Sequence, residues 1–456
     1  MFKKFTNGCV KLVQNFLPDA FVFCIILTII VFIAAIPVTG MSPIEVVAAW
    51  GGGVWNLLAF SMQMALVLVL GSALANAPVV KRGIVALADI PKKPSSSIAF
   101  VFVISAIACF INWGFGLIVG ALLAKEVAKK IPNVDYRLII AAAYAGFVIW
   151  HSGISGSIPL SMTTLNADGV IANTGGAVTE PVPTSETIFS AWNLIMIVVL
   201  VIVLALVLKA MHPDEKDTVS IDPALLVDEE KTYPEPVTPA EKIENSPILS
   251  IITVVLGVVY IVYYFVNAGN ILSALTLNIV NLIFLILGIA VHKTPIGYVR
   301  AITQAADSAG GIILQFPFYA GIQGMMVTAG ASGVSLAAAM SNFFVSISSP
   351  RSFPVFCYLA AGVVNFFVPS GGGQWSVQGP IMMPAGLELG VSPAVTAMGI
   401  AWGDAWTNML QPFWALPALG VAGLGARDIM GYCAIVLIVS GIVTALGFII
   451  LVPIFA

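Results

Sequence analysis

The sequence is poor in charge. Only 9% of its 456 residues are Asp, Glu, Lys or Arg, whereas a soluble globular protein carries roughly a quarter. Hydrophobic residues make up 59% of the chain, and the mean hydropathy is +1.02. Apolar runs of about 20 residues, the length that a helix needs to cross a bilayer, recur from end to end. The composition excludes a soluble domain on one anchor and predicts an all-α polytopic membrane protein.

Motifs of enzymes and metal sites are also missing. The five cysteines are scattered, with no CxxC pair and no His/Cys cluster at metal-ligand spacing. The GISGS stretch at 153–157 has serine where a GxSxG nucleophile motif ends in glycine, and no Walker loop occurs. With a net charge of −3 and no basic patch with interleaved aromatics, nothing indicates nucleic acid. We therefore expect no enzyme activity, no organic cofactor and no nucleic-acid partner.

Eleven apolar stretches are expected to enter the membrane. Two of them, 96–130 and 352–388, are too long for one crossing and are interrupted by turn residues, so each is interpreted as a re-entrant helical hairpin. With the N-terminus in the cytoplasm, this topology places 18 of the 19 basic residues inside and only Arg351 outside, which matches the positive-inside rule. The nine single spans are 17–36, 57–77, 136–163, 187–209, 247–267, 271–291, 310–330, 392–418 and 429–455.

The chain divides into two similar halves. Residues 210–246 are acidic and proline-rich, without helical periodicity, and predict a cytoplasmic linker. The halves, 1–209 and 268–456, each read as two spans, a hairpin, a polar-interrupted span and a closing span. The connecting helix 247–267 reverses the second half, which indicates an inverted repeat. The interrupted spans are 136–163 and 392–418.

Polar, glycine and proline residues match between the halves. An offset of 253 residues pairs Asn112 with Asn365 and His151 with Asp404. We interpret these matches as support for the repeat, because Asn, Gly and Pro are less often identical by chance than Leu or Val. The remaining pairs are Gly120 with Gly373, Gly146 with Gly399, Pro159 with Pro412, and Ser155 with Asn408.

The most polar stretch in an apolar region is NFFVPSGGGQWSVQGP, residues 365–380. Three consecutive glycines let the backbone turn sharply and lie close to a ligand. Unpaired backbone groups are tolerated at membrane depth only inside protein or beside a water-filled cavity. The other hairpin breaks at NWGFG, residues 112–116, and the two tips are expected to meet near the membrane midplane.

Each tip is expected to face an unwound part of the following span. These parts are HSGISGSIP at 151–159 and GDAWTNMLQP at 403–412, where small and polar residues precede a proline. Exposed helix N-termini attract a carboxylate, and unwound carbonyls suit a cation. No Lys or Arg lies in a span interior, which favours a monocarboxylate over a dicarboxylate or phosphate. An apolar wall for a short aliphatic tail, or ordinary packing, is expected from Trp113, Phe115, Trp375, Trp402, Trp406 and Trp414.

Two sets of candidate residues follow, although small residues can also serve only close helix packing and His151 can be an ordinary interior histidine. Asp404 is an acid deep in a span, and such acids are usually functional. The candidate substrate-binding residues are Asn112, Trp113, Gly114, His151, Ser152, Ser155, Ser370, Gly371, Gly372, Gly373, Gln374 and Trp375. The candidate ion-coupling residues are Asn112, Asn365, Asp404, Thr407 and Asn408, with a sodium ion considered at the hairpin tips.

These segments, together with NFLPDAFVF at 15–23, resemble the short-chain fatty acid transporter (AtoE) family of the ion transporter superfamily. The resemblance implies dimeric, inverted-repeat carriers in the bacterial inner membrane that work by an elevator motion. It also implies uptake of acetoacetate, butyrate or similar monocarboxylates. In sodium-coupled relatives an Asn at each tip helps to bind the ion, which falls here on Asn112 and Asn365. The Ser-Asn-Thr tip of the dicarboxylate branch is missing.

The expected function is a secondary active transporter that couples a short monocarboxylate to a cation, either sodium or a proton. Oxygen-rich tips favour sodium, whereas a His/Asp pair suits a proton. The alternatives are a passive channel for small anions or weak acids, and a membrane receptor or scaffold without transport. Paired hairpins favour the carrier, because a channel would more readily show an uninterrupted polar lining through several spans.

Overall fold

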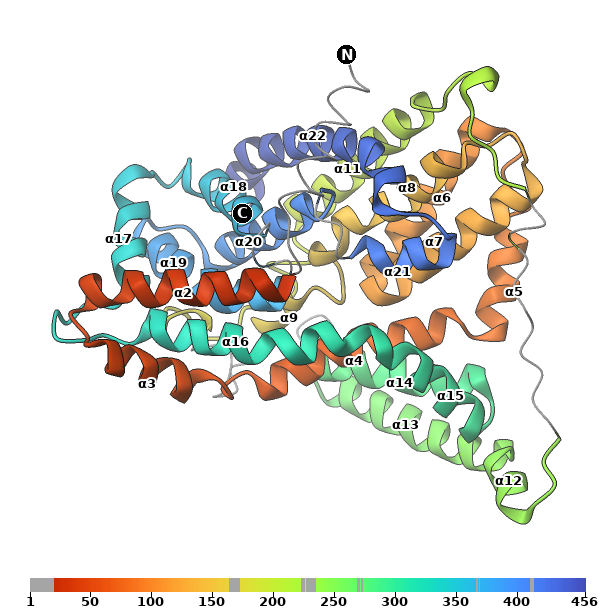
Figure 1. Cartoon of the computed structure of the whole chain (residues 1–456), viewed down its shortest axis with the longest axis horizontal. Coiled ribbons are helices and arrows are strands. Elements are labelled where there is room, and N and C mark those ends of the chain that lie inside the picture. The colour runs from red at the N-terminus through yellow and green to blue at the C-terminus, as the bar shows by residue number, and fades with distance from the viewer. Residues whose placement is uncertain are drawn as a thin grey trace.

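The computed structural model in Figure 1 describes residues 20–163, 173–222, 226, 235–268, 271, 274–365, 368, 370–410 and 414–456. Helices make up most of these residues, and the one extended pairing found among them is an isolated bridge between Ala329 and Ser335. By length and composition, six helical segments in the described ranges can cross a membrane. The expected all-α class is confirmed, and the protein has several membrane-spanning helices.

The helices of the first half run from the N-terminal span to the end of the closing span. They are α2 (Ala20–Thr39), α3 (Pro43–Gly53), α4 (Leu58–Ala75), α5 (Pro78–Leu87), α6 (Pro94–Ile111), α7 (Trp113–Lys130), α8 (Tyr136–Ala145), the 3₁₀ helix η1 (Gly146–Ser152), α9 (Ser157–Ser161) and α11 (Ala191–Ala210). The linker region contains η2 (Glu215–Asp217) and α12 (Pro239–Glu244).

The connecting helix is α13 (Pro247–Asn267), and the second half follows it. The helices of the second half are α14 (Leu277–His292), α15 (Pro295–Ala306), η4 (Asp307–Ala309), α16 (Gly310–Val327), α17 (Leu336–Ile347), α18 (Phe353–Asn365), α19 (Gly371–Glu388), α20 (Pro393–Thr407), α21 (Ala415–Ala422), α22 (Ala426–Ile450) and α23 (Val452–Phe455).

The order of helices recurs in the two halves at a nearly constant separation. Helix α4 begins at Leu58 and ends at Ala75, and α16 begins and ends 252 residues later. Helix α15 begins 252 residues after α3, and α14 ends 253 residues after α2. Each half therefore presents a long helix, a short helix, a second long helix and a second short helix before its helix pair.

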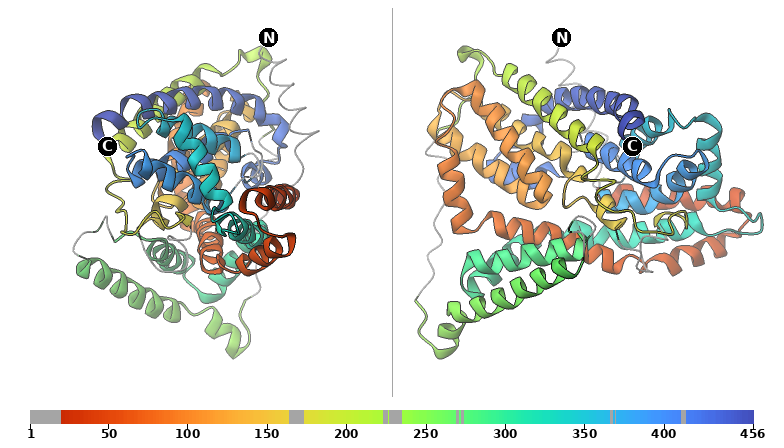
Figure 2. Two further views of the ribbon diagram at one scale, coloured as in Figure 1. Left: turned by 90° about the vertical axis from the view of Figure 1, so that its left-hand side faces the viewer. Right: turned by 180° about the vertical axis from the view of Figure 1, so that it is seen from behind.

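Figures 1 and 2 show the helices in two groups. Helix α16 packs on α2, α3 and α4, and α14 packs on α4 and α13, so these helices form one group. The other group contains α6, α7, α8, α18, α19, α20 and α22, with α20 against η1 and α11 against α22. Helix α5 runs between the groups at one end and α17 at the other (Figure 1).

The short helices were not expected from the sequence. Helices α3, α5, α15 and α17 have 10 to 12 residues, so a search for spanning apolar runs passes over them. A capping side chain followed by proline starts two of them, at Ser42 and at Thr294. The linker, expected without helix, contains α12, where Thr238 and Glu241 form a capping box.

The stretch 96–130 forms two antiparallel helices, α6 and α7, joined at Asn112. This residue has an extended backbone, and its Oδ1 accepts the Phe115 N–H at 2.9 Å, which caps α7. The arms pack so closely that a Cβ atom at Gly116 would overlap Cys109, and one at Gly120 would overlap Ser105. Glycine at these two positions is thus a condition for the helix pair.

The stretch 352–388 also forms two helices, α18 and α19. Helix α19 begins at Gly371, one residue after Ser370, whose Oγ accepts the Gly373 N–H at 3.4 Å. The arms are held together by Gln374, whose Nε2 donates to the Ala361 carbonyl at 2.9 Å. Residues 366, 367 and 369, which belong to the expected tip, lie outside the described residues.

The stretch 136–163 is interrupted where polar residues begin. Helix α8 passes into the 3₁₀ helix η1 at Gly146, the chain turns between Gly153 and Gly156, and α9 follows. Pro159 lies in the first turn of α9, where a missing N–H is tolerated. In the second half α20 ends at Thr407, and Pro412 lies outside the described residues.

Candidate functional site

A buried histidine and a buried acid meet between the two halves. Nδ1 of His151 lies 2.7 Å from Oδ2 of Asp404, and both side chains are fully buried. The Ile158 N–H, which can only donate, lies 3.1 Å from His151 Nε2, so Nε2 is the acceptor and Nδ1 carries the proton. In this arrangement the imidazole is neutral and donates to the carboxylate, and the pair can take up one further proton or cation.

The interruption of the helix after η1 fixes the position of the His151 ring. The Trp150 ring stacks on the His151 ring with centroids 4.0 Å apart, and Ser157 Oγ lies 2.9 Å from His151 Nε2. A Cβ atom at Gly371 would lie 2.5 Å from His151 Cε1, closer than any real contact. The second tip therefore reaches the histidine because residue 371 has no side chain.

The first tip contacts the same segment. The main-chain N–H of Trp113 donates to Ser155 Oγ at 2.9 Å, and the main-chain N–H of Ile154 donates to the Phe110 carbonyl at 2.7 Å. A Cβ atom at Gly153 would overlap the main chain of Phe110. Segment 150–157 thus lies against both tips.

The two following glycines of the second tip face the other helix group. A Cβ atom at Gly372 would lie 2.5 Å from the Phe60 ring, and one at Gly373 would lie 2.5 Å from the Tyr319 ring. Phe60 belongs to α4 and Tyr319 to α16. Among the three glycines, Gly371 adjoins His151, and Gly372 and Gly373 adjoin aromatic rings of α4 and α16.

Several predicted ligand oxygens already have hydrogen-bond donors. Asn112 Oδ1 accepts from Phe115, and Asn408 Oδ1 accepts from Trp150 Nε1 at 3.0 Å. Thr407 Oγ1 donates to the Gly362 carbonyl at 2.9 Å and accepts from Asn365 Nδ2 at 2.9 Å. The structure therefore gives these three oxygens capping or packing partners.

Three oxygens of the predicted site residues are instead buried and have no partner among the described residues: Asn365 Oδ1, Gln374 Oε1 and Asp404 Oδ1. The partners of each amide fix its orientation. The Ala361 carbonyl can only accept, so the Gln374 atom that contacts it is Nε2. Thr407 Oγ1 donates its proton to the Gly362 carbonyl, so it accepts from Asn365 Nδ2. The three residues belong to α18, α19 and α20, which pack on one another. Unpaired buried oxygens of this kind suit a hard cation.

The remaining predicted residues have structural contacts. Ser152 Oγ donates to the Ile149 carbonyl at 2.8 Å, and a Cβ atom at Gly114 would lie 3.0 Å from Leu68 Cα. Trp375 is fully buried on α19. No group of three or more His, Cys, Asp or Glu side chains was found among the described residues, so a bound cation there would depend on amide, hydroxyl and carbonyl oxygens.

Sequence reasoning missed Asn193 and the stacked rings of Phe147 and Trp150. Asn193 Oδ1 accepts from Trp402 Nε1 at 2.9 Å, and its Nδ2 donates to the Ile188 carbonyl at 2.8 Å and the Ser152 carbonyl at 3.3 Å. It ties the end of η1 to α20. The sequence signal that could have identified Asn193 is its position as a lone amide inside the apolar span 187–209.

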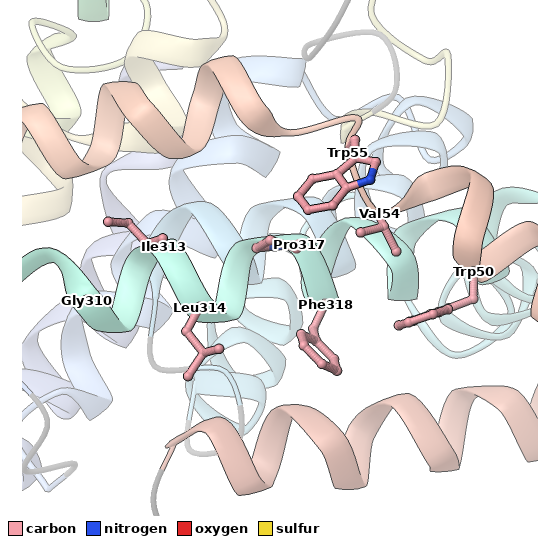
Figure 3. A pocket seen from close by; sticks show the side chains of 8 residues that line it. All are labelled: Trp50, Val54, Trp55, Gly310, Ile313, Leu314, Pro317 and Phe318. Carbon is pink, nitrogen blue, oxygen red and sulfur yellow. The ribbon is translucent and has the colours of Figure 1, made fainter.

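An apolar groove of about 420 Å³ lies elsewhere, along α3 and α16 (Figure 3). Its lining residues include Trp50, Trp55, Leu314 and Phe318. Trp55 is 65% exposed, so the groove is open to the surroundings of the protein. An open groove of apolar side chains does not match the polar, enclosed surroundings of His151, and we do not assign it to the site.

The chain is similar over most of its length to known proteins. The chain is 43% identical over 450 residues to a putative short-chain fatty acid transporter of Escherichia coli K12, covering 98% of this chain and 99% of that one. It is 42% identical over 454 residues to a protein of the same description from Haemophilus influenzae, with the same coverage. The YdaH transporter of Alcanivorax borkumensis has a similar fold, with a TM-score of 0.57 at 14% identity, covering 95% of this chain and 96% of that one.

The family model described as short chain fatty acid transporter matches residues 1–451. That match spans both helix pairs and segment 150–157. Together with the two relatives of similar length, it shows that the chain belongs to the short-chain fatty acid transporter family.

Proposed function

We propose that the protein is a secondary active transporter that imports short-chain monocarboxylates, such as acetoacetate or butyrate, together with a cation. The observation that carries this proposal is the buried His151–Asp404 pair, which lies where segment 150–157 meets both tips. A proton can be taken up by the pair itself. A sodium ion can instead be held by the unpaired oxygens of Asp404, Asn365 and Gln374.

The arrangement of helices supports an elevator motion within this proposal. The two helix groups of Figure 1 are joined by α5 and α17, and the group with both helix pairs carries the His151–Asp404 pair. In this proposal the helix pairs are re-entrant hairpins of an inverted repeat, and the group that contains them moves with the substrate. The protein is a homodimer in the bacterial inner membrane, with its N-terminus in the cytoplasm. A passive channel is the alternative, because it needs no coupling site.

The decisive experiment compares the wild type with Asp404→Asn in proteoliposomes. The variant keeps an acceptor for His151 Nδ1 but removes the charge that a cation neutralises. We expect accumulation of labelled butyrate driven by a sodium or proton gradient to be abolished. Under proton coupling, butyrate exchange should be less affected, and under sodium coupling the apparent sodium affinity should weaken.

Asp428→Asn is the matched control, because Asp428 forms an ion pair at 3.6 Å with Arg137 at the start of α8, at the opposite end of this helix from segment 150–157. Normal accumulation is expected from it. If Asp404→Asn also accumulates butyrate normally and responds to both gradients as the wild type does, Asp404 is structural. If the wild type equilibrates butyrate without accumulating it under either gradient, the protein is a channel.

A further inference from the structure

Four buried N–H donors near the tips have no partner among the described residues, and two of them, Trp375 Nε1 and Gln378 Nε2, belong to α19. The other two adjoin segment 150–157: Nε1 of Trp113 and Nδ2 of Asn408, residues that are 3% and 0% exposed. Buried polar groups in native proteins are nearly always paired, so an unpaired donor indicates a missing ligand or water. Both atoms can donate but not accept, and they therefore suit an anion.

The Asn408 amide has only one consistent orientation. Trp150 Nε1 can only donate, so the atom 3.0 Å from it must be the Asn408 oxygen, and the NH₂ group points elsewhere. The Asn408 main-chain oxygen accepts from the Tyr144 hydroxyl at 2.7 Å. Asn408 thus offers a donor to a ligand, whereas its sequence context had suggested an oxygen ligand for a cation.

The two donors adjoin one cluster of aromatic rings. The Trp150 ring stacks on Phe147 with centroids 5.4 Å apart and lies 5.7 Å from the Trp113 ring. The Trp113 ring meets Trp414 at 4.9 Å. Ring faces and edges of this kind form an apolar surface next to the two N–H groups, which matches a molecule with a charged end and a short aliphatic tail.

We propose that Trp113 Nε1 and Asn408 Nδ2 bind the carboxylate of the transported acid, whose tail lies against the rings of Trp113, Phe147 and Trp414. This proposal rests on the proposed function. Two neutral donors suffice for one carboxylate and provide no charge for a second. The basic residue of α7 that is nearest to Trp113 in the sequence, Lys125, is 12 residues beyond it, or about 18 Å along the helix.

The position of Asn408 also connects substrate binding to cation binding. Asn408 follows Asp404 by four residues at the end of α20, so the two side chains are on the same side of the helix. A substrate carboxylate at Asn408 Nδ2 lies next to the Asp404 carboxylate and repels it unless Asp404 has taken up a cation. Substrate and cation therefore favour each other's binding, which is the thermodynamic requirement for coupled transport.

Butyrate counterflow in proteoliposomes tests the assignment through two variants and a control. Trp113→Phe keeps the ring and removes the N–H, and Asn408→Ala removes the amide. For each we expect the KM for butyrate to rise about tenfold, the effect of one lost hydrogen bond to a charged group. The apparent affinity for the cation at saturating butyrate should stay unchanged. Trp50→Phe is the control, because Trp50 Nε1 is also buried and unpaired but lies on α3.

The outcomes separate this inference from the proposed function. If the wild type shows no counterflow with any short monocarboxylate, the proposed function itself is wrong. If the wild type is active and both variants keep a wild-type KM, the carboxylate assignment is overturned and the transport function stands. Trp375→Phe adds a third test, because a raised KM in this variant with a normal KM in Trp113→Phe would place the carboxylate on α19. Should Asn408→Ala fail to give monodisperse protein, Trp113→Phe decides.

Discussion

The two tips differ in what they touch. The first is a junction of one residue, Asn112, and its glycines bring main chain against main chain: a Cβ atom at Gly114 would lie 3.0 to 3.1 Å from the backbone of Leu68. At the second tip the glycines of α19 face side chains of Phe60, Tyr319 and His151. Main-chain contacts cannot relax without moving a helix, whereas an aromatic ring can rotate away. The first tip is thus a rigid part of the site, and the second is held by contacts that can be released.

The largest effect is expected from a side chain added beneath the first tip. A Cβ atom at Gly71 would overlap Asn112 Oδ1 and lie 2.6 Å from the Phe115 nitrogen, so Gly71→Val removes the cap of α7. We expect the free energy of unfolding to fall by about 3 kcal/mol, which is at the upper end of the usual cost of overpacking a core. The measurements are a lower thermal midpoint and a loss of monodisperse protein.

Gly83→Ala on α5 is the control for Gly71→Val, because nothing lies within 4 Å of its added Cβ. This change should leave the protein unaffected or stabilise it by about 0.5 to 1 kcal/mol. A Gly71→Val protein as stable as the wild type would show that the first tip is not rigid.

A smaller effect on folding, with a larger effect on transport, is expected at the second tip. In Gly372→Val the new side chain meets the Phe60 and Phe316 rings, at 2.5 and 3.2 Å for its Cβ, and these rings can turn aside. We expect folded protein with butyrate uptake reduced about tenfold, equivalent to about 1.4 kcal/mol in the transport barrier. Combining it with Phe60→Ala should restore part of the uptake. Wild-type uptake in the single variant would mean that this contact does not matter for transport.

The smallest effect is expected at the base of the first helix pair. Lys130 Nζ lies 2.6 Å from Asp89 Oδ1, and this hydrogen bond lowers the pKa of the exposed Asp89 carboxyl. A lowered pKa in the folded state stabilises the protein above the ordinary range of Asp and loses this contribution as the pH falls through the lowered value. Asp89→Asn should therefore lower the thermal midpoint only slightly at neutral pH, with unchanged transport, because exposed ion pairs contribute little. A large drop would show that the base, and not the tip, holds the pair together.

Much of the fold could be predicted because membrane helices obey simple rules of length and charge. The interruption of 96–130 at Asn112 follows from an amide and two glycines inside an apolar run. The helices α3, α5, α15 and α17 could not be found in this way, since none is long enough to cross a bilayer. Their signals are local, as in the Ser42–Pro43 start of α3, and are too common in any sequence to stand alone.

The site was predictable in its membership more than in its chemistry. The offset of 253 paired His151 with Asp404, and these two side chains form a hydrogen bond in the structure. The role of each amide was beyond sequence reasoning, because it depends on which neighbour is a pure donor or a pure acceptor. Trp150 Nε1 donates to the Asn408 oxygen and so leaves the Asn408 NH₂ group for another partner. The Ala361 carbonyl accepts from Gln374 Nε2 and so leaves the Gln374 oxygen for another partner.

The contact between residues 253 apart has a consequence for how such a chain is encoded. Under the proposed repeat, two equivalent positions that touch must lie close to the pseudo-twofold axis. In a complex of two identical halves that place would be occupied by the same residue twice, and two acids or two protonated histidines would repel each other. One polypeptide that contains both halves can put histidine on one side and aspartate on the other. Fusion of the halves therefore makes available a complementary pair that exact symmetry forbids.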